Sequence, residues 1–133
     1  MSQENVEIVR AAIDAWNRRD FDSLRNLVQA NVELHLIGGF ADLTGTEFKG
    51  REAVFRFWHD LIATVGGEFD LEAAHQAGDR VVTIATLRGA GGTSGVPGET
   101  RFGQVWSLHD GKVSRMDSYY EASEALEAAG LRE

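Results

Sequence analysis

The spacing of hydrophobic residues predicts three helices in the first half of the chain. Apolar side chains recur every three to four positions over 2–16, 21–28 and 51–65, as they do in helices that bury one face. Asp20 or Asp22 can cap the second of these helices, and a pair of glycines after residue 65 ends the third.

A second period marks the strands. Apolar and polar residues alternate over 32–36, which predicts a first strand, and they alternate again over most of 68–120, which predicts four more. A glycine-rich loop at 90–98 divides the second group, and a short helix ended by Gly130 follows it. The segment 38–50 is expected to be a loop. This order predicts an α+β domain in which one strongly curved antiparallel sheet carries helices on its concave face.

The hairpin 101–120 is the stretch with the most distinctive pattern. Phe102, Gln104, Trp106 and Leu108 alternate onto one face of its first strand, so one amide lies in an otherwise apolar row. A buried carboxamide without a partner costs about 1–3 kcal/mol. Gln104 is therefore expected to bond another side chain, a backbone group, water or a ligand.

The partners of Gln104 depend on the turn of this hairpin. A two-residue loop at 110–111 places Gln104 opposite Asp117 and turns both Arg115 and Asp117 inward. In that register Asp117 is a strong candidate for a general base.

A three-residue loop at 109–111 instead places Gln104 opposite Met116, with Ser118 and Tyr120 on the same face. This register keeps both charged side chains out of the apolar face, and a slip of one residue is costly wherever one face is buried. We predict the three-residue loop.

Composition and charge narrow the class of protein. The 133 residues are 43% hydrophobic, which predicts a single domain over 1–133 with a real core. The formal net charge of -8 argues against nucleic acid or an anionic membrane as a partner. The N-terminus lacks the pattern of a secretion signal, no run is long enough to span a membrane, and there is no cysteine, so a cytoplasmic protein is expected.

Four segments, in order, carry a resemblance to a known family: AWNRRDFDSLRNLVQANVELH, FKGREAVFRFW, AGDRVV and RFGQVWSLHDGKVSRMDSYYEASEALEAAGL. Together they resemble the nuclear transport factor 2-like superfamily in its SnoaL-like, polyketide-cyclase-like branch, which is related to ketosteroid isomerases. The resemblance implies a cone-shaped, curved antiparallel sheet wrapped around three N-terminal helices, with a short C-terminal helix. It also implies an apolar pocket at the open end of the cone and, often, a homodimer formed through the sheet. It does not define an activity.

Ketosteroid isomerases similar to this chain use an aspartate base, a tyrosine and a protonated acid. The resemblance aligns Leu36, Ala12 and Gln104 with those three positions. An amide donates a hydrogen bond to a carbonyl but does not move a proton, so isomerisation by that mechanism is not expected.

Two further residues are candidates for acid-base chemistry beside Gln104. His75 alternates with apolar residues on the predicted inner face, where it would act near neutral pH or serve as a core histidine bonded to a backbone carbonyl. Asp117 is the other, through the alternative hairpin register. The remaining histidines, His35, His59 and His109, are expected at the surface. Their spacing gives no metal-binding set, so neither a metal nor another cofactor is expected.

The three tryptophans come from separate elements that this fold would bring together, either as core or as the wall of a flat hydrophobic ligand site. Gln104 is the predicted polar anchor of the pocket. Its other predicted residues are Trp16, Leu36, Phe57, Trp58, Trp106, Met116, Ser118 and Tyr120.

Two function classes follow from such a pocket. The first is a protein that binds a small apolar, oxygenated molecule without changing it. The second is an isomerase, cyclase, dehydratase or hydrolase acting on a polyketide-, steroid- or terpenoid-like substrate. On the predicted outer face of the sheet, the apolar Val82, Ile84 and Val105 predict a homodimer.

Overall fold

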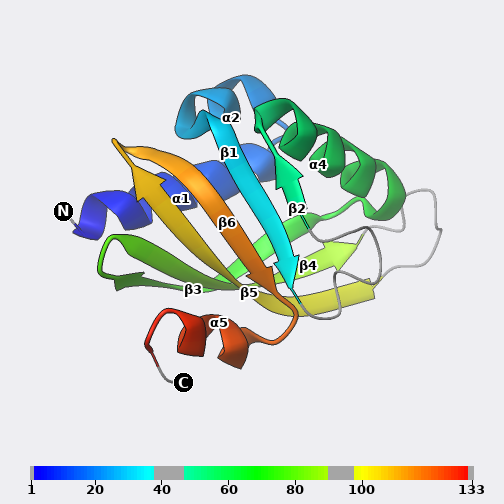
Figure 1. Cartoon of the computed structure of the whole chain (residues 1–133). Helices are drawn as coiled ribbons and strands as arrows, with labels where there is room; N and C mark the ends of the chain where they lie inside the picture. The colour runs from blue at the N-terminus through cyan, green and yellow to red at the C-terminus, as the bar shows by residue number, and fades with distance from the viewer. Residues whose placement is uncertain (1, 38–46, 90–97, 132–133) are drawn as a thin grey trace.

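The computed structural model describes residues 2–37, 47–89 and 98–131 (Figure 1). The helices are α1 (Ser2–Asn17), α2 (Phe21–Leu27), α4 (Arg51–Val65) and α5 (Ala122–Ala128). The strands are β1 (Val28–Ile37), β2 (Glu47–Lys49), β3 (Glu68–Ala77), β4 (Arg80–Gly89), β5 (Gly98–His109) and β6 (Lys112–Tyr119). The predicted α+β class is confirmed.

The strands form one six-stranded sheet in the order β2-β1-β6-β5-β4-β3. Every neighbouring pair is antiparallel except β1 and β6, which run parallel. The prediction of a wholly antiparallel sheet is therefore wrong at this one pair. The reason is topological: the chain between β1 and β6 contains α4 and four strands, which is more than a parallel crossover needs.

The helices lie on both faces of the sheet. Helices α1, α2 and α4 cover one face, called the inner face below, and share a buried core with it. Helix α5 packs on the other, outer face, beside β5 and β6 (Figure 1). No helix of the described residues is long and apolar enough to cross a membrane.

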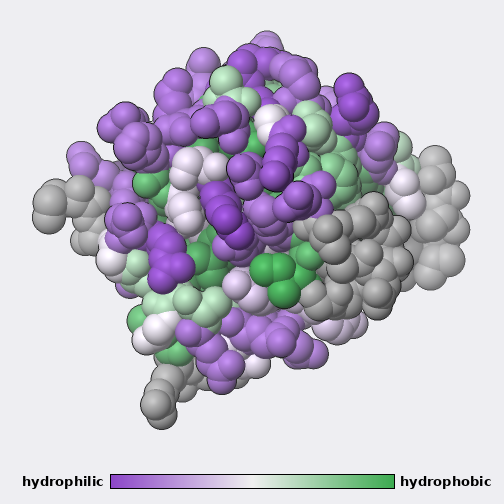
Figure 2. Space-filling model, in the orientation of Figure 1, coloured by the Kyte–Doolittle hydropathy of each residue, from purple (hydrophilic) through white to green (hydrophobic). Residues whose placement is uncertain are grey.

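Helix α5 covers the outer residues from which a homodimer was predicted. Val82, Ile84 and Val105 are at most 5% exposed, because α5 lays Ala125 and other small or apolar side chains over them. The helix comes close because Gly103 lies beneath it: a Cβ at Gly103 would lie 2.6 Å from the Ala125 Cβ. The chain thus buries this strip against itself, and the strip no longer supports a dimer. On the face shown in Figure 2, hydrophilic residues cover most of the described surface.

The hairpin between β5 and β6 differs from the predicted one. Its loop has two residues, Asp110 and Gly111, both with positive φ (53° and 75°), as in the mirror-image turns typical of hairpins. A bulge at Ser114, whose hydroxyl donates to the Ser107 carbonyl at 3.1 Å, then shifts the pairing by one residue. Gln104 consequently pairs with Ser118.

The faces of this hairpin are nevertheless as predicted, because the actual register differs from the predicted one by two residues. Met116 and Ser118 are buried on the inner face with Gln104 and Trp106. Asp117 pairs with Val105, which belongs to the outer cluster.

A second bulge, in β3, overturns the prediction for His75. The pairing with β4 shifts between Leu71 and Ala73, so the residues after Glu72 change faces. Phe69 and Leu71 pack into the inner core, whereas His75 pairs with Val82 on the outer face and is exposed. His75 is not an inward-facing residue.

The remaining helix and loop boundaries agree closely with those predicted from the sequence. The Asp20 side chain accepts the amide of Ser23 at 3.1 Å as the N-cap of α2, and Gly66 ends α4 with φ 71°. In the segment predicted to be a loop, 47–49 forms the short edge strand β2, and 38–46 lies outside the described residues. Of the glycine-rich loop predicted at 90–98, residues 90–97 also lie outside them, and Gly98 begins β5.

Candidate functional site

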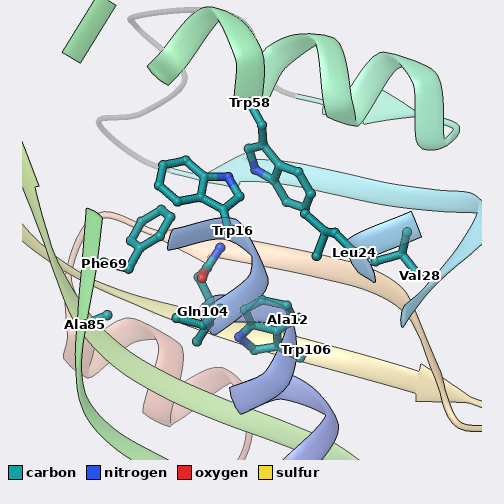
Figure 3. Close-up of a pocket in the computed structure, with 10 residues that line it drawn as sticks. Ala12, Trp16, Leu24, Val28, Trp58, Phe69, Ala85, Gln104 and Trp106 are labelled. Carbon is teal, nitrogen blue, oxygen red and sulfur yellow. The ribbon is translucent and has the colours of Figure 1, made fainter. Parts of the chain in front are cut away.

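A cavity lies between the inner face of the sheet and helices α1, α2 and α4 (Figure 3). Its hollow measures about 440 Å³ with the part open to solvent included, and about 20 Å³ of it can hold the centre of a water-sized sphere. The lining residues are Ala12, Ile13, Trp16, Leu24, Val28, Trp58, Phe69, Ala85, Gln104 and Trp106. The interior of the cavity therefore has room for about one water-sized group, and a larger ligand must move some of the wall.

Three tryptophans from three elements form much of this wall. Trp16 comes from α1, Trp58 from α4 and Trp106 from β5, and they are 2%, 7% and 4% exposed. In Figure 3 the rings of Trp16 and Trp58 lie on one side of the cavity, and Gln104 extends its amide toward them from the sheet. The site combines flat aromatic surfaces with one amide, as small-molecule sites commonly do.

Contacts on several sides hold Trp16 in place. The Phe69 ring lies 4.4 Å from its ring, centroid to centroid, and the Arg19 guanidinium lies 4.9 Å from the Trp16 ring centroid. Arg19 is itself held by the carbonyls of Trp16 and Gly67. The Asn17 amide pairs with the backbone of Phe69, donating to its carbonyl at 2.9 Å and accepting its N–H at 2.8 Å. These contacts couple the end of α1 to the edge strand β3.

The polar atoms of the site differ in how they are satisfied. Trp106 Nε1 donates to Thr83 Oγ1 at 2.8 Å, and Gln104 Nε2 donates to Ser118 Oγ at 2.7 Å. Trp16 Nε1 is buried without a hydrogen-bond partner in the described structure. An unpaired buried donor costs about 1–3 kcal/mol, so this N–H can accept a partner at the cavity with a net gain.

Comparison with protein families identifies the fold. The model of the SnoaL-like domain matches residues 9–116. The chain belongs to the SnoaL-like domain family. A search of curated proteins gives no significant match.

Several solved structures share this SnoaL-like fold at low identity. Bal32a, from a soil-derived mobile gene cassette, is 24% identical, with 88% of each chain covered and a TM-score of 0.79. TerC, co-crystallized with polyporic acid, is 22% identical over 96% of this chain and 98% of its own, with a TM-score of 0.77. A protein from Catenulispora acidiphila with a ketosteroid isomerase-like fold, in complex with trimethylamine, is 23% identical over 94% and 93%, with a TM-score of 0.70. At these identities the likeness extends to the fold alone.

The structure brings together part of the residue set predicted for the pocket. Trp16, Trp58, Trp106 and Gln104 line the cavity. Ala12, which the resemblance aligns with the isomerase tyrosine, lines it too, one helical turn before Trp16.

The other predicted pocket residues lie elsewhere among the described residues. Leu36 and Met116 are buried in the core, and Ser118 reaches the site only through its bond to Gln104. Phe57 stacks on Phe48 with ring centroids 4.6 Å apart, and Tyr120 is 48% exposed.

Asp117 lies on the outer face and does not line the cavity. It accepts from Arg115 Nε at 2.9 Å, and this hydrogen bond raises the pKa of Arg115. Its parallel neighbour His35 lies 2.8 Å, Nε2 to Oε1, from Glu33, and that hydrogen bond lowers the pKa of the Glu33 carboxyl. This polar cluster faces away from the tryptophans.

Sequence reasoning missed Phe69 as a wall of the site. Its alternation with Leu71 correctly placed it on the inner face, yet nothing in the pattern connected it with Trp16. The one local sign of a contact between the end of α1 and Phe69 is Asn17, because asparagine at a helix end readily pairs with backbone groups. Six of the ten lining residues were absent from the predicted pocket: Ala12, Ile13, Leu24, Val28, Phe69 and Ala85.

The chemistry available at the cavity is hydrogen bonding and aromatic stacking. None of the ten described lining residues has an ionisable side chain. Among the described residues, no group of three or more His, Asp or Glu side chains is placed to hold a metal ion.

Proposed function

We propose that this single-domain SnoaL-like protein binds a small hydrophobic molecule in the cavity between α1, α4 and the sheet. The observation that carries the proposal is the convergence of three tryptophans and Phe69 on a cavity whose lining includes one amide, Gln104. Aromatic walls supply contact area, and a few polar groups orient the ligand.

The character of the lining favours binding over acid-base catalysis. General acid-base chemistry needs a titratable group within hydrogen-bond reach of the reacting atom. His75 and Asp117, the sequence-based candidates, lie on the outer face, and the described lining offers no replacement.

Two structural neighbours were crystallized with ligands of different kinds. TerC was co-crystallized with polyporic acid, and the Catenulispora acidiphila protein was in complex with trimethylamine. Both compounds are therefore useful first probes for this chain, together with 1-indanone, a compact two-ring ketone.

The test is calorimetric titration of these three probes into the wild type and an Ala12→Leu variant. Ala12 is 2% exposed and lines the cavity, so a leucine there would fill the space a ligand needs. We expect at least one probe to bind the wild type and to lose roughly tenfold or more in affinity in the variant.

The matched control is Ala11→Leu, because Ala11 is the exposed neighbour of Ala12 on the same helix. Ala11→Leu should bind as the wild type does. If Ala12→Leu raises the melting temperature while binding is the same in all three proteins, the cavity is a packing gap and the proposed function is wrong.

The homodimer remains a separate prediction. The apolar residues from which it was predicted lie under α5. A second copy on that face would therefore meet α5 and the charged residues around Arg115 and Asp117. Light scattering at tens of micromolar measures the mass, and a monomer mass would contradict the dimer.

A further inference from the structure

The indole nitrogen of Trp16 distinguishes this residue from the other polar groups at the cavity. Trp106 and Gln104 donate to Thr83 and Ser118, whereas Trp16 Nε1 is buried and bonds no acceptor in the described structure. Two tryptophans in one site therefore differ: one N–H is used within the protein and the other is not.

The Trp16 ring is held in place and cannot readily turn its N–H toward an acceptor elsewhere in the protein. The ring is packed against Phe69, and Arg19, itself tied to two backbone carbonyls, lies over it. Asn17, the next residue, is bonded to the Phe69 backbone through both ends of its amide. A ring held from several sides keeps its N–H inside the site, as a preorganised hydrogen-bond donor does.

The charge at the cavity limits which acceptors suit this donor. A carboxylate would lose its hydration among apolar walls, and none of the ten described lining residues is a cation to compensate it. Arg19, the cation beside the Trp16 ring, is exposed and already donates to two backbone carbonyls. A neutral carbonyl oxygen costs far less to desolvate and accepts one or two N–H bonds.

The size of the cavity limits how much of a ligand fits without a change in the wall. Its interior has room for a group about the size of a carbonyl oxygen, and the ring of the ligand needs part of the wall to move.

We infer that Trp16 is a specificity-determining residue which selects neutral, carbonyl-bearing ring compounds by donating its Nε1–H to the ligand oxygen. This inference rests on the proposed function, because it names the ligand class of the same cavity. Gln104, whose second amide hydrogen is not used in the bond to Ser118, is the neighbouring polar group that orients the same oxygen.

The experiment compares two ligands of nearly the same shape, 1-indanone and indane, which lacks the oxygen. We expect the wild type to bind 1-indanone roughly tenfold or more tightly than indane. Trp16→Phe, which keeps a ring but removes the N–H, should reduce that ratio by roughly five- to tenfold. Tyr120→Phe is the control, because it also keeps a ring and removes a hydrogen-bond donor, but at an exposed residue outside the cavity lining, so it should leave the ratio intact.

A second measurement uses the wild type alone, so it does not depend on how the variant folds. The three indole N–H signals of the ¹⁵N-labelled protein are followed by NMR during both titrations. We expect 1-indanone, but not indane, to move the Trp16 signal downfield, as a new hydrogen bond does.

The outcomes separate the inference from the proposed function. Equal affinities of the wild type for both compounds, or an unchanged ratio in a folded Trp16→Phe variant, would overturn the inference and leave the binding site standing. Binding of neither compound by the wild type would overturn the inference. If polyporic acid and trimethylamine also fail to bind the wild type, the proposed function is wrong as well.

Discussion

The hydrogen bond between Gln104 and Ser118 allows the stability of the site to be separated from its affinity. Gln104 Nε2 donates to Ser118 Oγ at 2.7 Å, and Ser118 is only 4% exposed. Gln104→Leu removes the donor and leaves a buried hydroxyl without its partner, which should cost about 1–3 kcal/mol of unfolding free energy.

Removing the acceptor instead of the donor should cost less unfolding free energy. Ser118→Ala takes the acceptor away from Gln104, which is half-buried at the cavity and can turn to water, so about 0.5–1.5 kcal/mol is expected. The double variant replaces both partners with apolar groups, and its stability should return to within about 1 kcal/mol of the wild type. The coupling energy of the cycle is then about 1–3 kcal/mol.

The affinities of these variants for 1-indanone should not follow their stabilities. Both variants that carry Gln104→Leu lose the amide at the cavity, so each should bind 1-indanone more weakly by about 1 kcal/mol or more, including the double variant whose stability recovers. Urea unfolding gives the stabilities and calorimetry the affinities. Additive losses of stability, or affinity that recovers together with stability, would refute the reasoning.

Three further predictions concern the surrounding fold. Gly103→Ala should push α5 away and expose the outer apolar strip, seen as increased dye binding, and Ala125→Gly in the same chain should reverse it; no increase would contradict the close packing. Thr83→Val should destabilise the protein by about 1–3 kcal/mol in urea unfolding, because it leaves the buried Trp106 N–H unpaired. Hydrogen bonds from the first turn of α2 lower the pKa of Asp20, so its stabilising contribution is complete above about pH 4 and is lost as the pH falls through the folded-state pKa. Melting temperatures measured against pH should show this loss weakened in Asp20→Asn, and an unchanged acid dependence would contradict it.

The sequence predicted which face of the sheet a residue lies on better than it predicted which residues pair across neighbouring strands. Alternation alone placed Gln104, Trp106 and Met116 on the inner face, because a strand repeats every two residues whatever it pairs with. The pairing itself depended on a bulge at Ser114, which moves the register by one residue and leaves no mark in the hydrophobic pattern.

Two functional expectations depended on tertiary structure that the hydrophobic pattern does not report. A bulge beside Glu72 turns His75 to the outer face, although the residues before it alternate correctly. The apolar outer residues predicted a second copy, yet the last helix of the same chain covers them, and only tertiary structure reveals which partner an apolar strip finds.

The unpaired nitrogen of Trp16 lay wholly beyond sequence reasoning. The helical spacing of hydrophobic residues correctly buried this side chain, since helix periodicity reports which face is inside. Periodicity carries no information on which buried donors lack acceptors, because that depends on Thr83, Ser118 and other residues distant in sequence.

A crystal structure of the wild type grown with 1-indanone tests the central claim most directly. The account predicts density for the ketone within the cavity, with its ring against the tryptophans and its oxygen within about 3.2 Å of Trp16 Nε1. A ketone bound only at the outer surface, or a cavity unchanged in crystals saturated with the compound, would contradict it.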